Sequence, residues 1–146
     1  MKSLAIELPS IAISLKQPWA TLIVCADKDV ENRSWKTRFR GNVLIHASKK
    51  RDEKEMRSFM DLKEHHNFEP SWKHGEPLEW QDMPCGGIVG MVEIVDCVTE
   101  SESPWFVGEY GFVLRNARPL PFFPCRGSLS FWKCNYPREL LTGGQI

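Results

Sequence analysis

Short apolar runs separated by turn residues recur along the chain and predict a fold built mainly from strands. The strand-forming segments are residues 11–15, 30–33, 40–47, 86–99 and 111–117. The clearest is 86–99, where β-branched residues surround Gly90. A glycine inside a strand is typical of a bulge or bend, and such bends occur where a sheet curls into a barrel. We therefore expect an α+β fold with a small β-barrel, not a doubly wound sheet.

Two helices are expected to flank these strands. Pro18 suits the first turn of a short helix over residues 19–25, because its missing N–H is not needed there. Ser48 is a suitable N-cap for a longer helix ending near His65, whose narrow apolar stripe places it on the outside of the fold. Residues 66–84 contain three prolines and a glycine and are expected to form an excursion loop.

A single domain is expected over residues 1–146, because the chain is long enough for one core and shows no repeat or break in composition. Its apolar runs are far shorter than the ~20 residues that cross a bilayer, and its first residues lack the pattern of an export signal. The five cysteines are irregularly spaced without a C-x-x-C pair, which favours reduced thiols in a cytoplasmic setting. Histidine and cysteine spacings match no zinc pattern, so neither a metal nor a cofactor is expected.

Charge is unevenly distributed, although the net charge is zero. Residues 28–54 hold nine Lys/Arg against four Asp/Glu, residues 55–114 three against twelve, and residues 115–138 five against none. The two basic segments can form one face that attracts nucleic acid. Charges scattered over a solvated surface are the alternative, and the sequence leaves both open.

Three charges of mixed sign lie within six residues at Lys28, Glu31 and Arg33. Alternate residues of a strand share a face, so Glu31 and Arg33 should point the same way, and Lys28 can reach that side from the preceding turn. A carboxylate accepts from an exocyclic amine, a cation donates to carbonyl or phosphate oxygens, and a nearby tryptophan offers a stacking face. The cluster therefore suits a nucleobase, while a structural ion-pair network explains the same residues equally well.

This segment resembles the signature of the ASCH domain family, G-x-K-x-x-E-x-R, which stands here as residues 26–33 with Ala26 in place of the first glycine. Residues 14–20, 40–47, 86–90 and 110–114 also resemble members of the family. The likeness covers roughly residues 11–133 and leaves 66–84 unmatched. Alanine in a left-handed conformation costs about 1 kcal/mol more than glycine, so Ala26 leaves the geometry of the turn open.

The resemblance implies a PUA-like β-barrel with flanking helices and a cleft lined by Lys28, Glu31 and Arg33. It also implies binding of RNA or a nucleotide, with a link to translation or RNA modification. The full set of expected ligand-binding residues is Gln17, Trp19, Lys28, Glu31, Arg33, Trp105 and Tyr110. Trp19 and Trp105 are expected to form aromatic walls. Ser128 and Ser130, in a basic tail, either contact phosphate or cap a turn.

Whether the protein is an enzyme stays open. One branch of the resembled family is an amidohydrolase acting on N4-acetylcytidine, a modified nucleoside, and has a threonine at the position of Glu31. Lys28 is retained here without that hydroxyl nucleophile, although Glu31 can act as a general base on water if burial raises its pKa. A ribonuclease that also uses His46 and Tyr110 is a further alternative, but a histidine in an apolar strand is more typical of a core group. Lys28 and Glu31 would be the catalytic residues in either case.

Overall fold

The computed structural model describes residues 6–141, and within them the chain forms six strands, two α-helices and two 3-10 helices. In chain order these are β1 (Ile11–Leu15), α1 (Trp19–Cys25), β2 (Val30–Arg33), β3 (Gly41–Ala47), α2 (Glu53–His66), η1 (Trp80–Asp82), β4 (Gly87–Val98), β5 (Tyr110–Pro124), β6 (Phe131–Lys133) and η2 (Arg138–Leu141). Each of the expected strands and helices is present. The expected excursion loop, residues 66–84, begins at the last residue of α2. The rest of it is irregular except for the single turn of η1.

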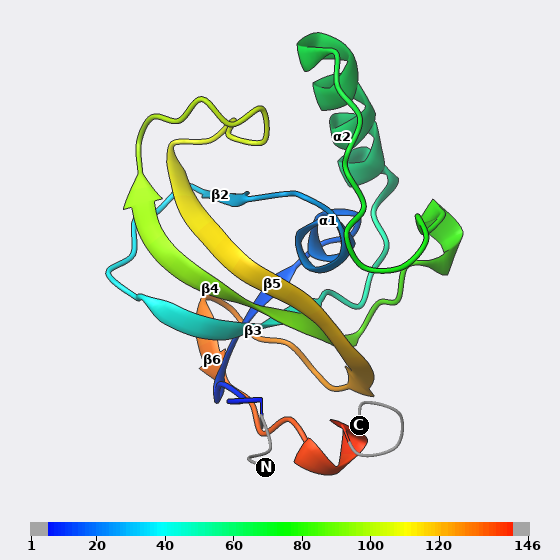
Figure 1. Ribbon diagram of the computed structural model, residues 1–146, viewed down its shortest axis with the longest axis vertical. Helices are drawn as coiled ribbons and strands as arrows, with labels where there is room; N and C mark the ends of the chain where they lie inside the picture. Colours follow the sequence, from blue (N-terminus) through cyan, green and yellow to red (C-terminus); the bar gives the residue numbers. More distant parts are fainter. Residues whose placement is uncertain (1–5, 142–146) are drawn as a thin grey trace, which may run out of the picture.

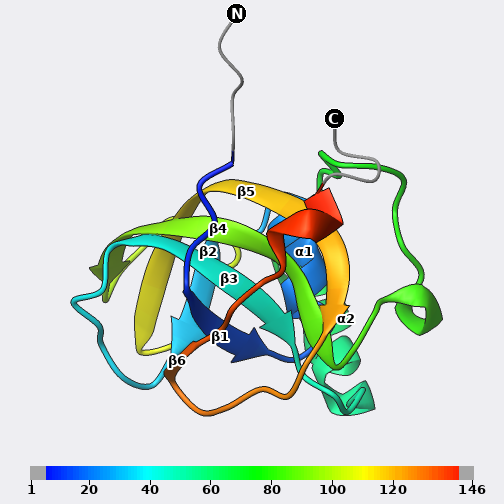
Figure 2. The same ribbon diagram turned by 90° about the horizontal axis from the view of Figure 1, so that it is seen from below.

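The strands form one mixed sheet in the order β2-β5-β4-β3-β1-β6, in which only the β1–β3 pair is parallel. The long strands β4 and β5 bend strongly (Figure 1). Seen from below, the sheet curls around α1 as a half-barrel (Figure 2). The α+β, barrel-like expectation is therefore confirmed, and the two edge strands, β2 and β6, bound the open side.

Helix α1 packs inside the curl and buries most of its residues. It approaches the sheet at Gly90, where an added Cβ would lie 2.6 Å from Cγ1 of Val24 and 2.4 Å from the carbonyl oxygen of Arg118. Beside Gly90, the registers of β4 with β3 and with β5 both skip Val89. The bulge expected at this glycine is therefore present, and the missing side chain also admits the helix.

Strand β5 continues to Pro124, beyond the segment 111–117 expected from the sequence, although Pro119, Pro121 and Pro124 follow that segment. Its pairing with β2 stops at Val113, while its pairing with β4 reaches Pro124. The N–H of Leu114 still donates to the carbonyl of Asp29 at 2.9 Å. Beyond Leu114 no strand pairs with this edge of β5, and proline is tolerated at such an edge because no N–H is required there.

Helix α2 begins after Asp52, not after the expected cap Ser48. The Asp52 carboxylate accepts a hydrogen bond from the main-chain N–H of Lys54 at 3.0 Å, and this bond, with help from Lys16, lowers the pKa of Asp52. Only Phe59 and Leu62 of the helix are buried, so α2 lies on the outside as expected. None of the helices in residues 6–141 combines the length and apolar character needed to cross a bilayer.

Candidate functional site

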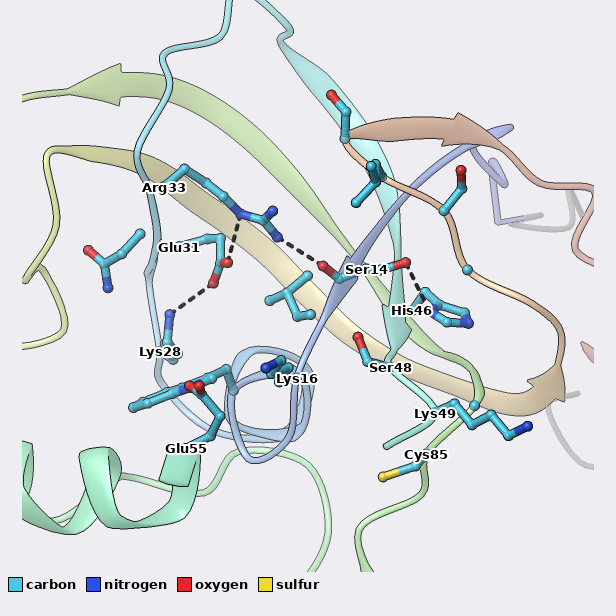
Figure 3. Close-up of a pocket in the computed structure, with 18 of the residues that line it drawn as sticks. Ser14, Lys16, Lys28, Glu31, Arg33, His46, Ser48, Lys49, Glu55 and Cys85 are labelled. Carbon is cyan, nitrogen blue, oxygen red and sulfur yellow. Dashed lines mark hydrogen bonds and ion pairs between the residues drawn. The ribbon is translucent and has the colours of Figure 1, made fainter. Parts of the chain in front are cut away.

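A groove of about 1340 Å³ opens on the side of the half-barrel where β2 faces β1. Strand β2 and the turn before it form one end, and the end of β3 with the loop after β5 forms the other (Figure 3). The charged residues that line it are Lys16, Lys28, Arg33, Lys49, Arg126, Glu31 and Glu55. Five of these seven are cations, and four of the five come from the two basic segments of the sequence: Lys28, Arg33 and Lys49 from the first, and Arg126 from the second. The two segments therefore meet at this groove, which attracts anions.

Glu31 lies between two cations at one end of the groove. Its Oε1 is 3.3 Å from Nζ of Lys28, and its Oε2 accepts from Nε of Arg33 at 3.1 Å. Arg33 also donates from Nη2 to the main-chain carbonyl of Ser14 at 2.9 Å. Figure 3 shows the three charged side chains converging, as the alternation along β2 predicts.

Lys28 lies beneath this cluster and not at its surface. The residue is 3% exposed, and its ammonium donates to the carbonyl of Val30 and to Glu31. The ring of Trp19 lies 5.5 Å from Nζ, close enough for a cation–π contact. Burial lowers the pKa of Lys28, while the Glu31 carboxylate opposes this shift. Glu31 and Arg33 thus present the charged surface of the groove, and Lys28 supports it from behind.

Ser14 and His46 form a second polar group deeper in the groove. Oγ of Ser14 lies 3.0 Å from Nδ1 of His46, and the other ring nitrogen, Nε2, lies 2.9 Å from the carbonyl oxygen of Cys125. A carbonyl can only accept, so Nε2 carries the proton and Nδ1 accepts from the Ser14 hydroxyl. Trp132 donates from Nε1 to that hydroxyl oxygen at 3.2 Å. Burial lowers the pKa of His46, which favours the neutral ring in this chain of hydrogen bonds.

The model of the ASCH domain family matches residues 13–120, which is most of the chain. The chain belongs to the ASCH domain family. It is also 29% identical over 133 residues to mouse activating signal cointegrator 1, and 30% identical over 138 residues to the human protein of that name. These alignments cover 83% of this chain and 22% of each relative, so the chain spans about a fifth of their length.

The ASCH assignment agrees with the curled α+β sheet and confirms the resemblance carried by residues 26–33. It also supports RNA binding as the general class of function. At the position of the first signature glycine, Ala26 is 5% exposed with φ −123°, an extended conformation that alanine adopts without strain. The turn before Lys28 therefore does not need a left-handed residue in this ASCH domain.

Trp19 lines the ASCH groove, as expected for an aromatic wall. Its Nε1 donates to Oε1 of Glu55 at 2.8 Å, and its ring packs edge-on against Phe59 at 5.9 Å. Both partners belong to α2, so this helix fixes the orientation of the indole. Glu55 was not singled out in the sequence, because only the folded chain brings α2 beside Trp19.

Gln17, Trp105 and Tyr110 were expected to contact a ligand, but none of them lines the groove. Gln17 is fully buried and bridges the main chain, donating to the carbonyl of Pro84 at 2.8 Å and accepting from the N–H of Thr21 at 2.9 Å.

Trp105 is 2% exposed, and its ring lies 6.1 Å from that of Phe59 and 5.0 Å from that of Phe68. A loop tryptophan needs either a packing partner or a ligand, and here the packing partners are present. Tyr110 lies opposite Arg33 in the β2–β5 ladder and is half-buried outside the groove.

The loop after β5 closes the far end of the groove, through residues 126–130. Gly127 lets it approach, because an added Cβ would lie 2.6 Å from both Cε1 of His46 and Oγ of Ser14. Leu129 is 91% exposed at this rim. Among the residues that the structure describes, no group of three or more His, Cys, Asp or Glu side chains is placed to hold a metal ion.

Proposed function

We propose that this ASCH domain binds RNA, or a nucleotide, with an unstacked base held at the Glu31 end of the groove. The observation that carries the proposal is the Glu31 carboxylate, held by Lys28 and Arg33 inside an open groove rimmed by further cations. Sequence-specific recognition of RNA relies on splayed bases that enter such pockets and bond to fixed polar groups. The proposal extends to a role in translation or RNA modification and to a cytoplasmic location.

The exposed surfaces of the cluster fit the edge of a base. Glu31 and Arg33 have side chains 13% and 20% exposed, so each keeps an accessible part while held in place. Glu31 accepts from an exocyclic amine, and the guanidinium of Arg33 donates to a carbonyl oxygen beside it. Trp19 supplies an apolar wall below them.

A purely structural ion-pair network accounts for only part of this arrangement. The Lys28 side chain, which is 2% exposed and donates to the main-chain carbonyl of Val30, serves the stability of the fold. A network that served stability alone would not require the outer carboxylate and guanidinium to line a groove of this size. The same carboxylate therefore has an inner structural side and an outer binding side.

A fluorescence titration with short single-stranded RNAs at two salt concentrations tests the proposal. We expect binding that weakens with salt, and an affinity loss of about tenfold in Glu31→Gln, since a charged hydrogen bond is removed. Glu109→Gln is the matched control, because Glu109 is exposed and lies outside the groove. No binding at low salt, or an equal affinity in Glu31→Gln and wild type, rejects the proposal.

The Ser14–His46 pair supports a second candidate, hydrolysis of an acylated nucleoside or of RNA. A hydroxyl that donates to a neutral imidazole in an open groove is the usual arrangement of an activated nucleophile. Incubation with N4-acetylcytidine and with single-stranded RNA, followed by chromatography, tests this candidate. Product formed by the wild type and lost in both Ser14→Ala and Lys28→Ala supports the candidate. A wild type that forms no more product than these variants rules it out.

A further inference from the structure

The end of the groove away from Glu31 carries polar side chains without partners. Ser48 and Lys49 lie at this end, opposite Lys28 and Glu31 (Figure 3). Across from them, the loop after β5 contributes Arg126, Ser128 and Ser130. Within residues 6–141, none of these five side chains forms a hydrogen bond or an ion pair. Hydroxyls and cations without internal partners remain available to a ligand.

The main chain adds further donors at this end. The N–H groups of residues 126–130 bond to no other main-chain or side-chain acceptor in the described part of the chain. The N–H of the preceding residue, Cys125, is by contrast used, because it donates to the carbonyl of Gly86 at 3.1 Å. Ser130 has φ +58°, a left-handed conformation that turns the chain at the end of this run.

The two sides of this end are held together by the fold. The carbonyl of Cys125 accepts from His46, and Gly127 packs directly on His46 and Ser14. Lys49 lies over Gly86, where an added Cβ would be 3.8 Å from the Cα of Lys49. These contacts hold the loop and the end of β3 in place on the two sides of this end of the groove.

The two acidic residues that line the groove, Glu31 and Glu55, both lie away from this end. Glu31 is held in its cluster with Lys28 and Arg33, and Glu55 is bonded to Trp19 on the α2 side (Figure 3). Beneath the far end lies the His46–Ser14 pair, which carries no negative charge. An anion placed there meets donors and cations without a facing carboxylate, an arrangement typical of phosphate contacts.

We propose that Ser48, Lys49, Arg126, Ser128 and the adjoining main-chain N–H groups form a phosphate subsite. This inference rests on the proposed function and refines it: the ligand of the ASCH groove is a phosphorylated nucleotide or an RNA phosphodiester, and not a free nucleoside. Ser14 links the two ends, since its carbonyl accepts from Arg33 and its hydroxyl donates to His46. A base at Glu31 and its phosphate at the loop lie on either side of this one residue.

Calorimetric titration of the full chain tests the subsite with three kinds of probe: the four ribonucleosides, their 3′- and 5′-monophosphates, and a short single-stranded RNA. We expect a monophosphate to bind at least about tenfold more tightly than its nucleoside, as one or two charge-assisted contacts provide. If the RNA binds more tightly than the nucleosides but the monophosphates do not, the recognised phosphate is one that links two nucleotides. Either result supports the subsite and identifies the source of its phosphate.

The variant Lys49→Ala with Arg126→Ala removes two cations from the subsite. We expect this variant to lose most of the extra affinity that a phosphorylated ligand has over its nucleoside. The affinity for nucleosides should change less than about twofold, because the Glu31 end is untouched. The control, Arg115→Ala with Arg118→Ala, removes the same charge from exposed positions of β5 outside the groove. Ser128→Ala, which removes only a hydroxyl, serves as a milder probe.

The outcomes separate the subsite from the proposed function. Nucleosides that bind as tightly as their phosphates and RNA overturn the subsite and leave the proposed function standing. Equal losses of affinity for the phosphorylated probes in the Lys49/Arg126 variant and the Arg115/Arg118 control also overturn the subsite. Such a result would show only a long-range effect of net charge. Absence of binding by every probe at low salt overturns both.

Discussion

Arg33 donates from Nη2 to the carbonyl of Ser14 at 2.9 Å and so joins the edge strand β2 to β1 across the open side of the half-barrel. β6 pairs with β1 only as far as Ile13, which lies opposite Phe131. The carbonyl used by Arg33 therefore belongs to the first residue beyond that pairing. The same guanidinium also bonds Glu31. One side chain thus both bridges the open side of the half-barrel and holds the carboxylate of the groove.

Arg33→Lys is expected to destabilise the protein and weaken RNA binding together. A lysine has a single ammonium and cannot hold Glu31 and the Ser14 carbonyl in the fork geometry of arginine. We expect a loss of about 1.5–3 kcal/mol in the free energy of unfolding, the value of a hydrogen bond to a charged group. Urea unfolding measures this loss, and Arg38→Lys, at an exposed position, is the control. An unchanged stability in Arg33→Lys would show that the bond to Ser14 does not stabilise the fold.

Glu31→Gln is expected to destabilise the protein more at low pH than at high pH. Burial already lowers the pKa of Lys28, and loss of the carboxylate lowers it further. The unfolded chain then binds a proton that the folded chain does not hold, so stability rises with pH. We expect a loss of about 2–3 kcal/mol near pH 6 that shrinks toward pH 9, measured by urea unfolding.

The double variant Lys28→Met with Glu31→Gln provides the check on this explanation. It leaves no buried ammonium, so it should recover part of the lost stability and lose the pH dependence. A Glu31→Gln penalty that is the same at pH 6 and pH 9 would contradict the account.

His46 is expected to make the folded state less stable as the solution becomes acidic. Burial lowers the pKa of His46 below the usual value near 6.5, so on acidification the unfolded chain takes up a proton before the folded one. The unfolded state then binds more protons, and the free energy of unfolding falls from pH 7.5 to 5.5. In thermal melts across this range, the melting temperature should fall less steeply with decreasing pH in His46→Gln than in the wild type. The exposed His74→Gln should keep the wild-type slope, and an equal slope in both variants would exclude His46 as the source.

Gln17→Leu is expected to lower stability by about 2–3 kcal/mol, because it leaves the buried N–H of Thr21 and carbonyl of Pro84 without partners. RNA affinity of the folded variant should stay within about twofold of wild type, since Gln17 does not line the groove. Chemical unfolding and the RNA titration together measure the two effects. Gln81→Leu, at an exposed position, is the matched control. A large loss of affinity without a loss of stability would restore Gln17 as a ligand contact.

The sequence predicted best those features that depend on local periodicity. Alternation along β2 is sufficient to place Glu31 and Arg33 on one face, and Gly90 indicates the bulge. The role of Trp105 was not predictable, because its packing partners Phe59 and Phe68 lie about forty residues earlier in the chain. For the same reason, a motif-based reading does not show the Ser14–His46 pair or the approach of Gly127.

The absent side chain of Gly90 sets the depth at which α1 lies in the half-barrel. Trp19 starts this helix and Lys28 follows three residues after its end, so both sides of the base-binding end move with it. A methyl group at position 90 would push α1 outward and displace both residues, although it touches no part of the groove. The width of the groove in this ASCH domain therefore depends on a buried position of the sheet behind α1, because a substitution there would shift side chains that line the groove without itself lining it.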